Sequence, residues 1–353
     1  MSDFISNLHI NAFRGIKGLT IGNLSTVNVL VGANNSGKTS VLESILFLSS
    51  PTDIGKITNM AFQRAPLVRA KRESQLVDFF STLFHKELDE DVNEPNHFHY
   101  SIDLSASVSK NNFSFSSSGT IENEFNTIGE ESKAFLFSTK IQTNDQKPLY
   151  REFRIPTSET EIQQIKSASS SFYRSLYVNS GVSYYNVCVN LMSNAILQYD
   201  KADLLAVIQS FDSTIQDVSI VDDCIYIHNS LSGTLPLYAY GTGLQKAALF
   251  SVIMSVMPDG IILIDEIDNA INMSAFSDVF PWFVKKCKER NIQAFVTTHS
   301  AEAIDSVLNS GLDNDIRIIT LRKKPKTHKT VAKVRTGSEA LSDRKNFKME
   351  LRV

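Results

Sequence analysis

The chain has 353 residues, 42% of them hydrophobic, and a formal net charge of −3 at pH 7. This length and composition predict a globular protein with a sizeable core, built as one large domain or two. They exclude a membrane-embedded class, because no stretch approaches the roughly 18 consecutive apolar residues of a membrane helix, and the N-terminus lacks the pattern of a signal peptide. We therefore expect a cytoplasmic protein with no membrane partner.

The cysteines lie far apart in the sequence and form no C-x-x-C pair. They are Cys188, Cys224 and Cys287. This spacing predicts neither a disulfide framework nor a zinc site, so we expect all of them to be core residues.

Two short strands, residues 5–10 and 19–21, are predicted at the start of the chain, joined through Phe13-Arg14-Gly15-Ile16. An apolar run, Val27–Val31, predicts a buried strand that leads directly into a glycine-bounded loop. The loop has the spacing G-x-x-x-x-G-K-[ST], and apolar residues at helical spacing follow it. The order strand, loop, helix distinguishes a phosphate-binding loop, or Walker A motif, from a chance match.

The chemistry of this loop predicts a site for ATP with Mg²⁺. Gly32 and Gly37 let the backbone curl so that successive N–H groups point inward, and the following helix adds the positive end of its dipole. Lys38 is expected to reach the β- and γ-phosphates, and the Thr39 hydroxyl to hold the metal ion. The predicted nucleotide-binding residues here are Gly32, Asn34, Asn35, Ser36, Gly37, Lys38, Thr39 and Ser40.

The middle of the chain alternates between helical and strand patterns. Residues 74–84 have helical apolar spacing, whereas residues 98–156 alternate apolar and polar side chains and predict an antiparallel β segment. Further predicted elements are a strand at Ser175–Val178, helices at 184–198 and 201–211, and strands at 218–221 and 224–228. No heptad pattern runs through this region, so we expect a globular insert and no coiled coil.

Carboxylates and a histidine follow predicted strands in the last third of the chain. The apolar strand 260–264 leads into Asp265 and Glu266, and the strand 292–298 leads into His299 after a helix predicted at 273–289. Successive side chains of a strand point in opposite directions, so the two acids are given different roles. We expect Asp265 to bind the Mg²⁺ shell, as a Walker B aspartate does, and Glu266 to polarise the attacking water.

These motifs and their order resemble the ATPase heads of the OLD, RecF and SMC families, and most of all a compact OLD-like head of the AAA15 type. The resemblance implies an α/β fold: an ABC/SMC-type P-loop ATPase head with a mixed sheet, an antiparallel β subdomain and a helical lobe. Residues 1–353 would form one head. Residues 1–50 would hold the N-terminal hairpin and Walker A, 51–240 the inserted β and helical lobe, and 241–353 the signature helix, Walker B, H-loop and basic C-terminal hairpin.

The resemblance also implies that nucleotide binds between two identical heads. The glycine-opened helix at residues 241–246 would then contact the nucleotide held by the other chain, through Gly241, Gly243 and Gln245, with Thr242 and Lys246 as further contacts. Glu266 and His299 would be catalytic, with His299 on the γ-phosphate.

Several interface details are left open by the resemblance. Asp268 and Asn269 fall where relatives cross the dimer interface, but Ala270 and Asn272 replace a glycine and a histidine there. A glutamine after the first helix senses the γ-phosphate in such heads. Gln63 and Gln75 are both candidates.

The implied function is an ATPase whose nucleotide-driven dimerisation, or higher even assembly, controls a separate nuclease-like effector in a bacterial anti-phage module. The alternatives are a RecF-like DNA-repair ATPase and a nucleotide-dependent scaffold with little turnover. Asp313-Asn-Asp315 spells the D-x-D of a Toprim nuclease but precedes a predicted strand, so we expect a turn and no Toprim domain.

The segment 317–353 carries twelve Lys or Arg residues against three acids, a difference of +9. Strands predicted at 316–321 and 330–334 would form a hairpin around Lys323-Lys-Pro-Lys. We interpret it as a docking face for the effector or for nucleic acid, since such a density of one sign attracts phosphate or acidic surfaces. The alternative is a solvated edge hairpin whose lysines deter strand pairing.

Overall fold

The protein is described from a computed structural model. It describes residues 4–62, 76–88, 98–109, 111–125, 131–144, 146–155, 171–179, 205, 208–209, 212–221, 224–270, 276–327, 329–347 and 350–351. Within these ranges, no helix combines the length and the apolar character needed to cross a membrane.

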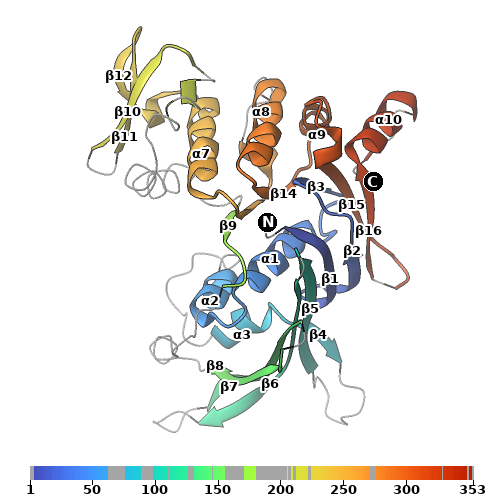
Figure 1. The fold of residues 1–353 in the computed structure, drawn as a ribbon. Helices are drawn as coiled ribbons and strands as arrows, with labels where there is room; N and C mark the ends of the chain where they lie inside the picture. Colours follow the sequence, from blue (N-terminus) through green and yellow to red (C-terminus); the bar gives the residue numbers. More distant parts are fainter. Residues whose placement is uncertain are drawn as a thin grey trace.

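A mixed sheet of six strands, in the order β16-β15-β3-β14-β13-β9, forms the upper lobe in Figure 1. The buried strand β3 (Val27–Val31) lies between β14 (Gln293–Thr297) and β15 (Ile316–Lys323), parallel to both. β13 (Ile261–Ile264) lies between β14 and β9 (Ser175–Val178), and β16 (Thr330–Thr336) closes the other edge antiparallel to β15. The carboxyl ends of the parallel strands therefore meet at one edge of the sheet.

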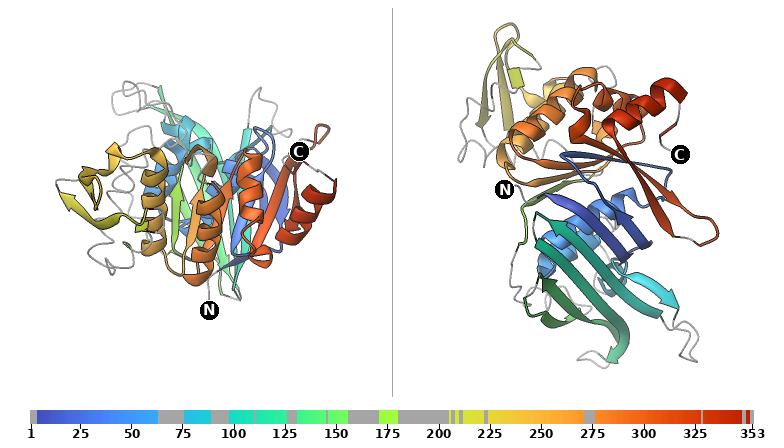
Figure 2. Two further views of the ribbon diagram at one scale, coloured as in Figure 1. Left: turned by 90° about the horizontal axis from the view of Figure 1, so that it is seen from above. Right: turned by 45° about the vertical axis from the view of Figure 1, so that its right-hand side comes forward.

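Helices cover both faces of this sheet. α7 (Thr242–Val256), α8 (Phe276–Glu289), α9 (Ala301–Leu308) and α10 (Gly337–Phe347) lie side by side on the outer face, as both views in Figure 2 show. α1 (Lys38–Ser49) packs against the other face, where its residues share a core with Leu263, Phe295 and Ile319. Along β13 the apolar side chains alternate between these two cores, which is why this central strand is apolar throughout.

A second, antiparallel sheet forms the lower lobe, in the order β2-β1-β5-β6-β7-β8 with β4 (His85–Leu88) paired to β5. Its strands are β1 (Ile5–Phe13), β2 (Ile16–Ile21), β5 (Phe98–Val108), β6 (Asn111–Phe125), β7 (Glu131–Thr143) and β8 (Leu149–Ile155). Its apolar face packs on α1, α2 (Ile54–Phe62) and α3 (Leu76–Ser81) through phenylalanines such as Phe80, Phe115 and Phe135. α1 thus lies between the two sheets.

A three-stranded sheet beside α7 completes the arrangement. It contains β10 (Ile215–Val221), β11 (Cys224–Asn229) and β12 (Gly233–Pro236), and η2 (Leu237–Ala239) connects it to α7. Apolar side chains of β10 and β11 join the core beneath α7 and α8.

The strand pattern predicted for residues 98–156 is confirmed, and the hairpin at the start of the chain extends the same sheet. The turn that we expect at Asp313-Asn-Asp315 is a short 3-10 helix, η5 (Asp313–Asp315). The helix predicted at 184–198 and most of that at 201–211 lie outside the described residues. α2, α9 and α10 are not predicted from the sequence.

The prediction that the cysteines are core residues holds for Cys287, whose burial raises the pKa of its thiol. Cys224 is half-buried at the start of β11, so for this residue the prediction is only partly met. Cys188 lies outside the described residues.

Candidate active site

The loop between β3 and α1 has the curled backbone that its sequence predicts. Gly32, Asn35 and Gly37 all have positive φ, at 149°, 61° and 101°. A Cβ on Gly32 would collide with the carbonyl oxygen of Leu321 in β15 and lie 2.8 Å from Ser36 Oγ. Gly37 is the N-cap of α1 and supplies no side-chain cap, so the helix start keeps its N–H groups for a ligand.

Lys38 lies folded against this loop. Its Nζ donates to the carbonyl oxygens of Gly32 at 2.9 Å and Ala33 at 3.0 Å, and the residue is only 7% exposed. Burial lowers the pKa of Lys38, although the nearby carboxylates of Asp265 and Glu266 oppose that shift. Lys38 is therefore a desolvated cation beside two acids, and a bound polyphosphate would stabilise its charged form.

Ser36 points into the same loop. Its Oγ is buried and has no hydrogen-bond partner among the described residues, and the residue is 4% exposed. A buried hydroxyl without a partner costs free energy, so this position fits a ligand that carries acceptor oxygens. A phosphate group has that chemistry.

Asp265 lies at the carboxyl end of β13, 6% exposed, and contacts the loop directly. Thr39 Oγ1 donates to Asp265 Oδ2 at 3.0 Å, and Thr297 Oγ1 donates to Asp265 Oδ1 at 2.6 Å. A threonine hydroxyl and a carboxylate are oxygen ligands of the kind that Mg²⁺ prefers. The residues present therefore fit the predicted metal.

Glu266 does not lie in the strand, so the prediction that strand alternation separates the two acids is wrong. β13 ends at Ile264, and Glu266 has a left-handed backbone with φ of 51°. Its backbone N–H donates to Thr297 Oγ1 at 2.7 Å. The turn and this hydrogen bond give the two acids their different positions. Such strain in a residue other than glycine is typical of functional sites.

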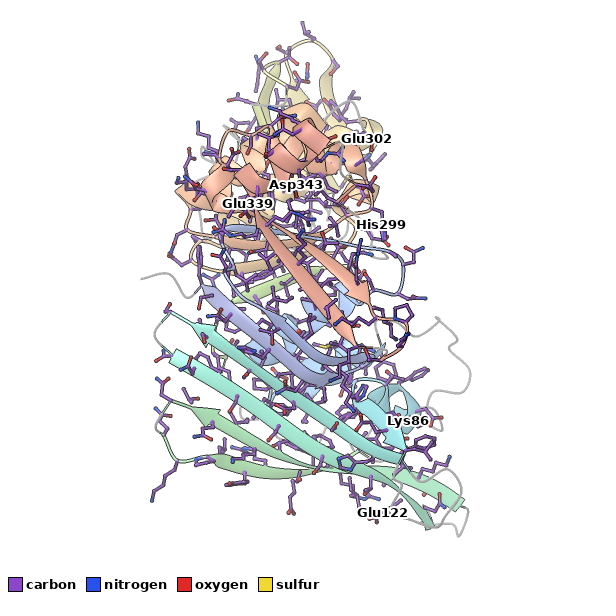
Figure 3. The ribbon with its side chains drawn as sticks, turned by 90° about the vertical axis from the view of Figure 1, so that its right-hand side faces the viewer. Lys86, Glu122, His299, Glu302, Glu339 and Asp343 are labelled. Atoms are coloured by element: carbon purple, nitrogen blue, oxygen red, sulfur yellow. The ribbon has the colours of Figure 1, made fainter. Side chains whose placement is uncertain are left out.

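His299 follows β14, two residues after Thr297, and Figure 3 labels it. Its backbone N–H donates to Asp268 Oδ2 at 3.2 Å. Asp268 Oδ1 is buried and has no partner within the described part of the chain. Asp268 thus holds the segment that carries His299, a contact that the sequence does not predict.

One cavity of about 860 Å³ brings these groups together. It is lined by Arg14, Gly15, Ile16, Asn34, Asn35, Ser36, Gly37, Lys38, Thr39, Ser40, Thr82, Asp265, Glu266, His299, Lys323 and Thr330. The predicted loop residues, both acids and the histidine therefore face one space. Gly32 lies behind it, as an acceptor for Lys38.

Sequence reasoning missed the cavity residues that come from other elements. Arg14 and Gly15 form the turn between β1 and β2, and Arg14 Nε makes a buried ion pair at 2.8 Å with Glu43 Oε2 of α1. Thr82 follows α3, and its main-chain and side-chain oxygens accept weakly from Arg14. The hairpin Phe13-Arg14-Gly15-Ile16 was a signal for the turn, but not for its place beside the cavity.

The glycine-opened helix is confirmed as α7, with Gly241 as its N-cap. Gln245 Nε2 donates to the Tyr240 carbonyl oxygen at 2.9 Å and so braces the start of this helix. Among the described residues, none of α7 lines the cavity, so this chain does not bring Gly241, Gly243 and Gln245 to its own phosphate loop. The side chains of Thr242 and Lys246 lie outside the description, as do Gln63 and Gln75.

Comparison with known proteins agrees with this geometry. A family model described as "AAA domain, putative AbiEii toxin, Type IV TA system" matches residues 27–305. An "ATP/GTP phosphatase" of Helicobacter pylori is 21% identical over 332 residues, which cover 85% of this chain and 86% of that protein. The DNA replication and repair protein RecF of Francisella tularensis is 50% identical over only 46 residues, 13% of each chain.

Two solved structures share the fold. An SMC head bound to the C-terminal winged-helix domain of ScpA has a TM-score of 0.51 at 14% identity, covering 96% of this chain and 99% of that one. The Pyrococcus furiosus Smc head with an extended coiled coil, bound to the C-terminal domain of ScpA, has a TM-score of 0.50 at 11% identity, covering 98% and 100%.

Fold and site together define an α/β P-loop ATPase head with the ABC/SMC-type fold, built from a mixed sheet and an antiparallel β subdomain. The chain belongs to the AAA domain family of the AbiEii type, whose model spans most of its length. It is a P-loop ATPase of the AAA/SMC-like class.

Proposed function

We propose that the protein hydrolyses ATP with Mg²⁺ in the cavity above the phosphate loop. The observation that carries the proposal is the convergence of Lys38, Thr39, Asp265, Glu266 and His299 on one space, from three separate segments. An unrelated structural role would not require two acids, a buried lysine and a histidine to face the same glycine loop.

Each residue has a role that its position supports. The loop N–H groups and Lys38 would hold the β- and γ-phosphates, and Thr39 and Asp265 would hold Mg²⁺. When bound, the ion would neutralise charge that builds up on the phosphates during transfer. Glu266 would orient and deprotonate the attacking water, and His299 would contact the γ-phosphate.

Two heads would be needed to complete each site. No residue of α7 that the structure describes lines the cavity of its own chain. In our proposal, the Gly241–Gly243 start of this helix therefore contacts the nucleotide of a partner chain. ATP would then join two copies, and hydrolysis would separate them. A switch of this kind is driven by contacts to the γ-phosphate.

We propose further that this switch controls a separate, nuclease-like effector in a bacterial anti-phage module. The AbiEii-type family supports a role among toxin systems, and the SMC heads similar in fold are solved with a partner protein. The basic hairpin β15–β16 is the docking face that we favour for the effector or for nucleic acid.

The test of hydrolysis compares the wild type with Lys38→Ala and Glu266→Gln, in Mg²⁺ and in EDTA. Lys38→Ala should lose ATP binding, whereas Glu266→Gln should bind ATP and stall at hydrolysis, because only the first residue reaches the phosphates. Binding is measured by calorimetry and turnover by phosphate release, with circular dichroism as the control for folding. An equal loss of ATP affinity in both variants would refute the separate roles of Lys38 and Glu266. Wild-type turnover that persists in EDTA would refute the requirement for Mg²⁺.

A further inference from the structure

The nucleotide cavity has a wall that the phosphate loop and the acids do not explain. Lys323 ends β15 and Thr330 begins β16, and the two residues are paired across the hairpin. Both line the cavity, together with the turn between β1 and β2. The C-terminal hairpin therefore takes part in the candidate site.

Strand register explains how Lys323 reaches the cavity. β15 runs parallel to β3, with Thr320 beside Val31, so the residues that follow Thr320 run alongside the phosphate loop. The Leu321 carbonyl oxygen lies so near this loop that a Cβ added to Gly32 would be 2.4 Å from it, which reflects the same close approach of β15. Figure 3 shows the hairpin extending from the upper lobe towards the antiparallel sheet.

Alternation along β15 gives neighbouring cations different surroundings. Arg322 lines a separate hollow of about 490 Å³ together with Lys333 and Arg335, whereas Lys323 faces the nucleotide cavity. This opposition is expected for successive residues of a strand. Beyond the strand, the backbone N–H of Lys324 donates to the Lys329 carbonyl oxygen at 2.9 Å and closes the tip.

Several other cations of the tail serve the fold. Arg335 pairs with Asp343 and donates to Thr320 Oγ1, and Arg344 pairs with Asp305. Lys323, by contrast, is an exposed side chain at the mouth of a cavity that suits an anion. Its charge is placed for a ligand.

The order of the strands indicates which part of the nucleotide Lys323 would meet. Asp265, Glu266 and His299 follow β13 and β14, which lie on one side of β3, whereas β15 lies on the other. If the γ-phosphate lies beside the acids, the α-phosphate and the nucleoside extend towards β15. An ammonium group there would contact phosphate oxygens as a point charge.

We propose that Lys323 is a nucleotide-binding residue that contacts the α-phosphate of the bound nucleotide in its own chain, with Thr330 beside it. This inference rests on the proposed ATPase function and adds a contact that is independent of the γ-phosphate. It also separates Lys323 from the docking face, which retains Lys324 and Lys326.

The test measures the affinity of Lys323→Ala for ADP and for a non-hydrolysable ATP analogue by isothermal titration calorimetry. Lys324→Ala is the matched control, because it removes the same charge from the adjacent residue. Lys323→Ala should weaken the binding of both nucleotides by about tenfold, the effect of one lost hydrogen bond to a charged group. Lys324→Ala should stay within about twofold of the wild type, because Lys324 is exposed, does not line the cavity, and is screened by solvent and salt.

The outcomes separate this inference from the proposed function. If the wild type binds neither nucleotide, the proposed function fails. If the wild type binds both and the two lysine variants behave alike, Lys323 is not a ligand-binding residue. A loss confined to the triphosphate analogue would overturn the assignment to the α-phosphate.

Discussion

Thr297 is the residue on which the geometry of both acids depends, and its replacement by valine provides the sharpest test of the site. Thr297 is 0% exposed, and its hydroxyl donates to Asp265 Oδ1 at 2.6 Å while accepting from the backbone N–H of Glu266 at 2.7 Å. Valine has nearly the same shape but offers neither hydrogen bond. Thr297→Val should therefore disturb the acids without leaving a cavity.

The expected cost follows from these two contacts. A hydrogen bond to a charged group contributes about 1.5–3 kcal/mol, and a buried N–H without a partner costs about 1–3 kcal/mol. We expect Thr297→Val to lower the free energy of unfolding by about 3 kcal/mol. The left-handed turn at Glu266 would also lose its anchor, so turnover should fall by about 100-fold, as for a misplacement of about 1 Å.

The assay combines urea unfolding with ATP turnover and ADP binding. Thr297→Ser is the matched control: it keeps the hydroxyl and removes one methyl group, at about 0.8 kcal/mol. ADP affinity in the absence of Mg²⁺ should be retained in both variants, because Thr297 does not line the cavity. Equal stability and turnover in the valine and serine variants would refute the argument that the hydroxyl positions the acids.

Three further predictions concern the loop, the assembly and the docking face. Gly32→Ala should lower the free energy of unfolding, measured by urea unfolding, by about 2 kcal/mol or more, because a Cβ there meets a backbone oxygen at positive φ. The control Gly15→Ala should leave the free energy of unfolding near that of the wild type, because there is open space around the added Cβ. Gly243→Glu should prevent ATP-driven dimerisation by placing a carboxylate against the partner's γ-phosphate; an unchanged ATP-bound dimer in light scattering would contradict this. Replacing Lys324 and Lys326 with glutamate should weaken binding to double-stranded DNA or to a co-purified partner, most strongly at low salt, while ATP turnover stays near wild type. Unaltered binding to both would show that the hairpin is not a docking face but a sheet edge protected by its lysines.

The sequence predicts those parts of the site that depend on neighbouring residues. The phosphate loop follows from Val27–Val31, the spacing of Gly32 and Gly37, and the apolar helix after them. The antiparallel sheet follows equally well, because alternation at residues 98–156 is a local signal.

Other parts of the site depend on the pairing of strands that lie far apart in the sequence, so neighbouring residues could not predict them. Nothing near Lys323 in the sequence shows that β15 pairs with β3 some 290 positions earlier. The left-handed backbone of Glu266 likewise depends on Thr297, which lies on a different strand. Strand alternation does not apply to Glu266, because β13 ends at Ile264, before both acids.

The position of α1 would allow a change in the bound nucleotide to be transmitted from the phosphate loop to the rest of the head. α1 begins at the phosphate loop, lies between the two sheets, and is tied to the β1–β2 turn by the buried pair of Arg14 and Glu43. A buried ion pair of this kind resists separation, because an unpaired charge left in the interior costs several kcal/mol. The loop, the hairpin turn and the lower sheet should therefore move as one body when the nucleotide changes. In the proposed dimer, this coupling would let hydrolysis in the cavity alter the surface that the lower lobe and the basic hairpin present to a partner.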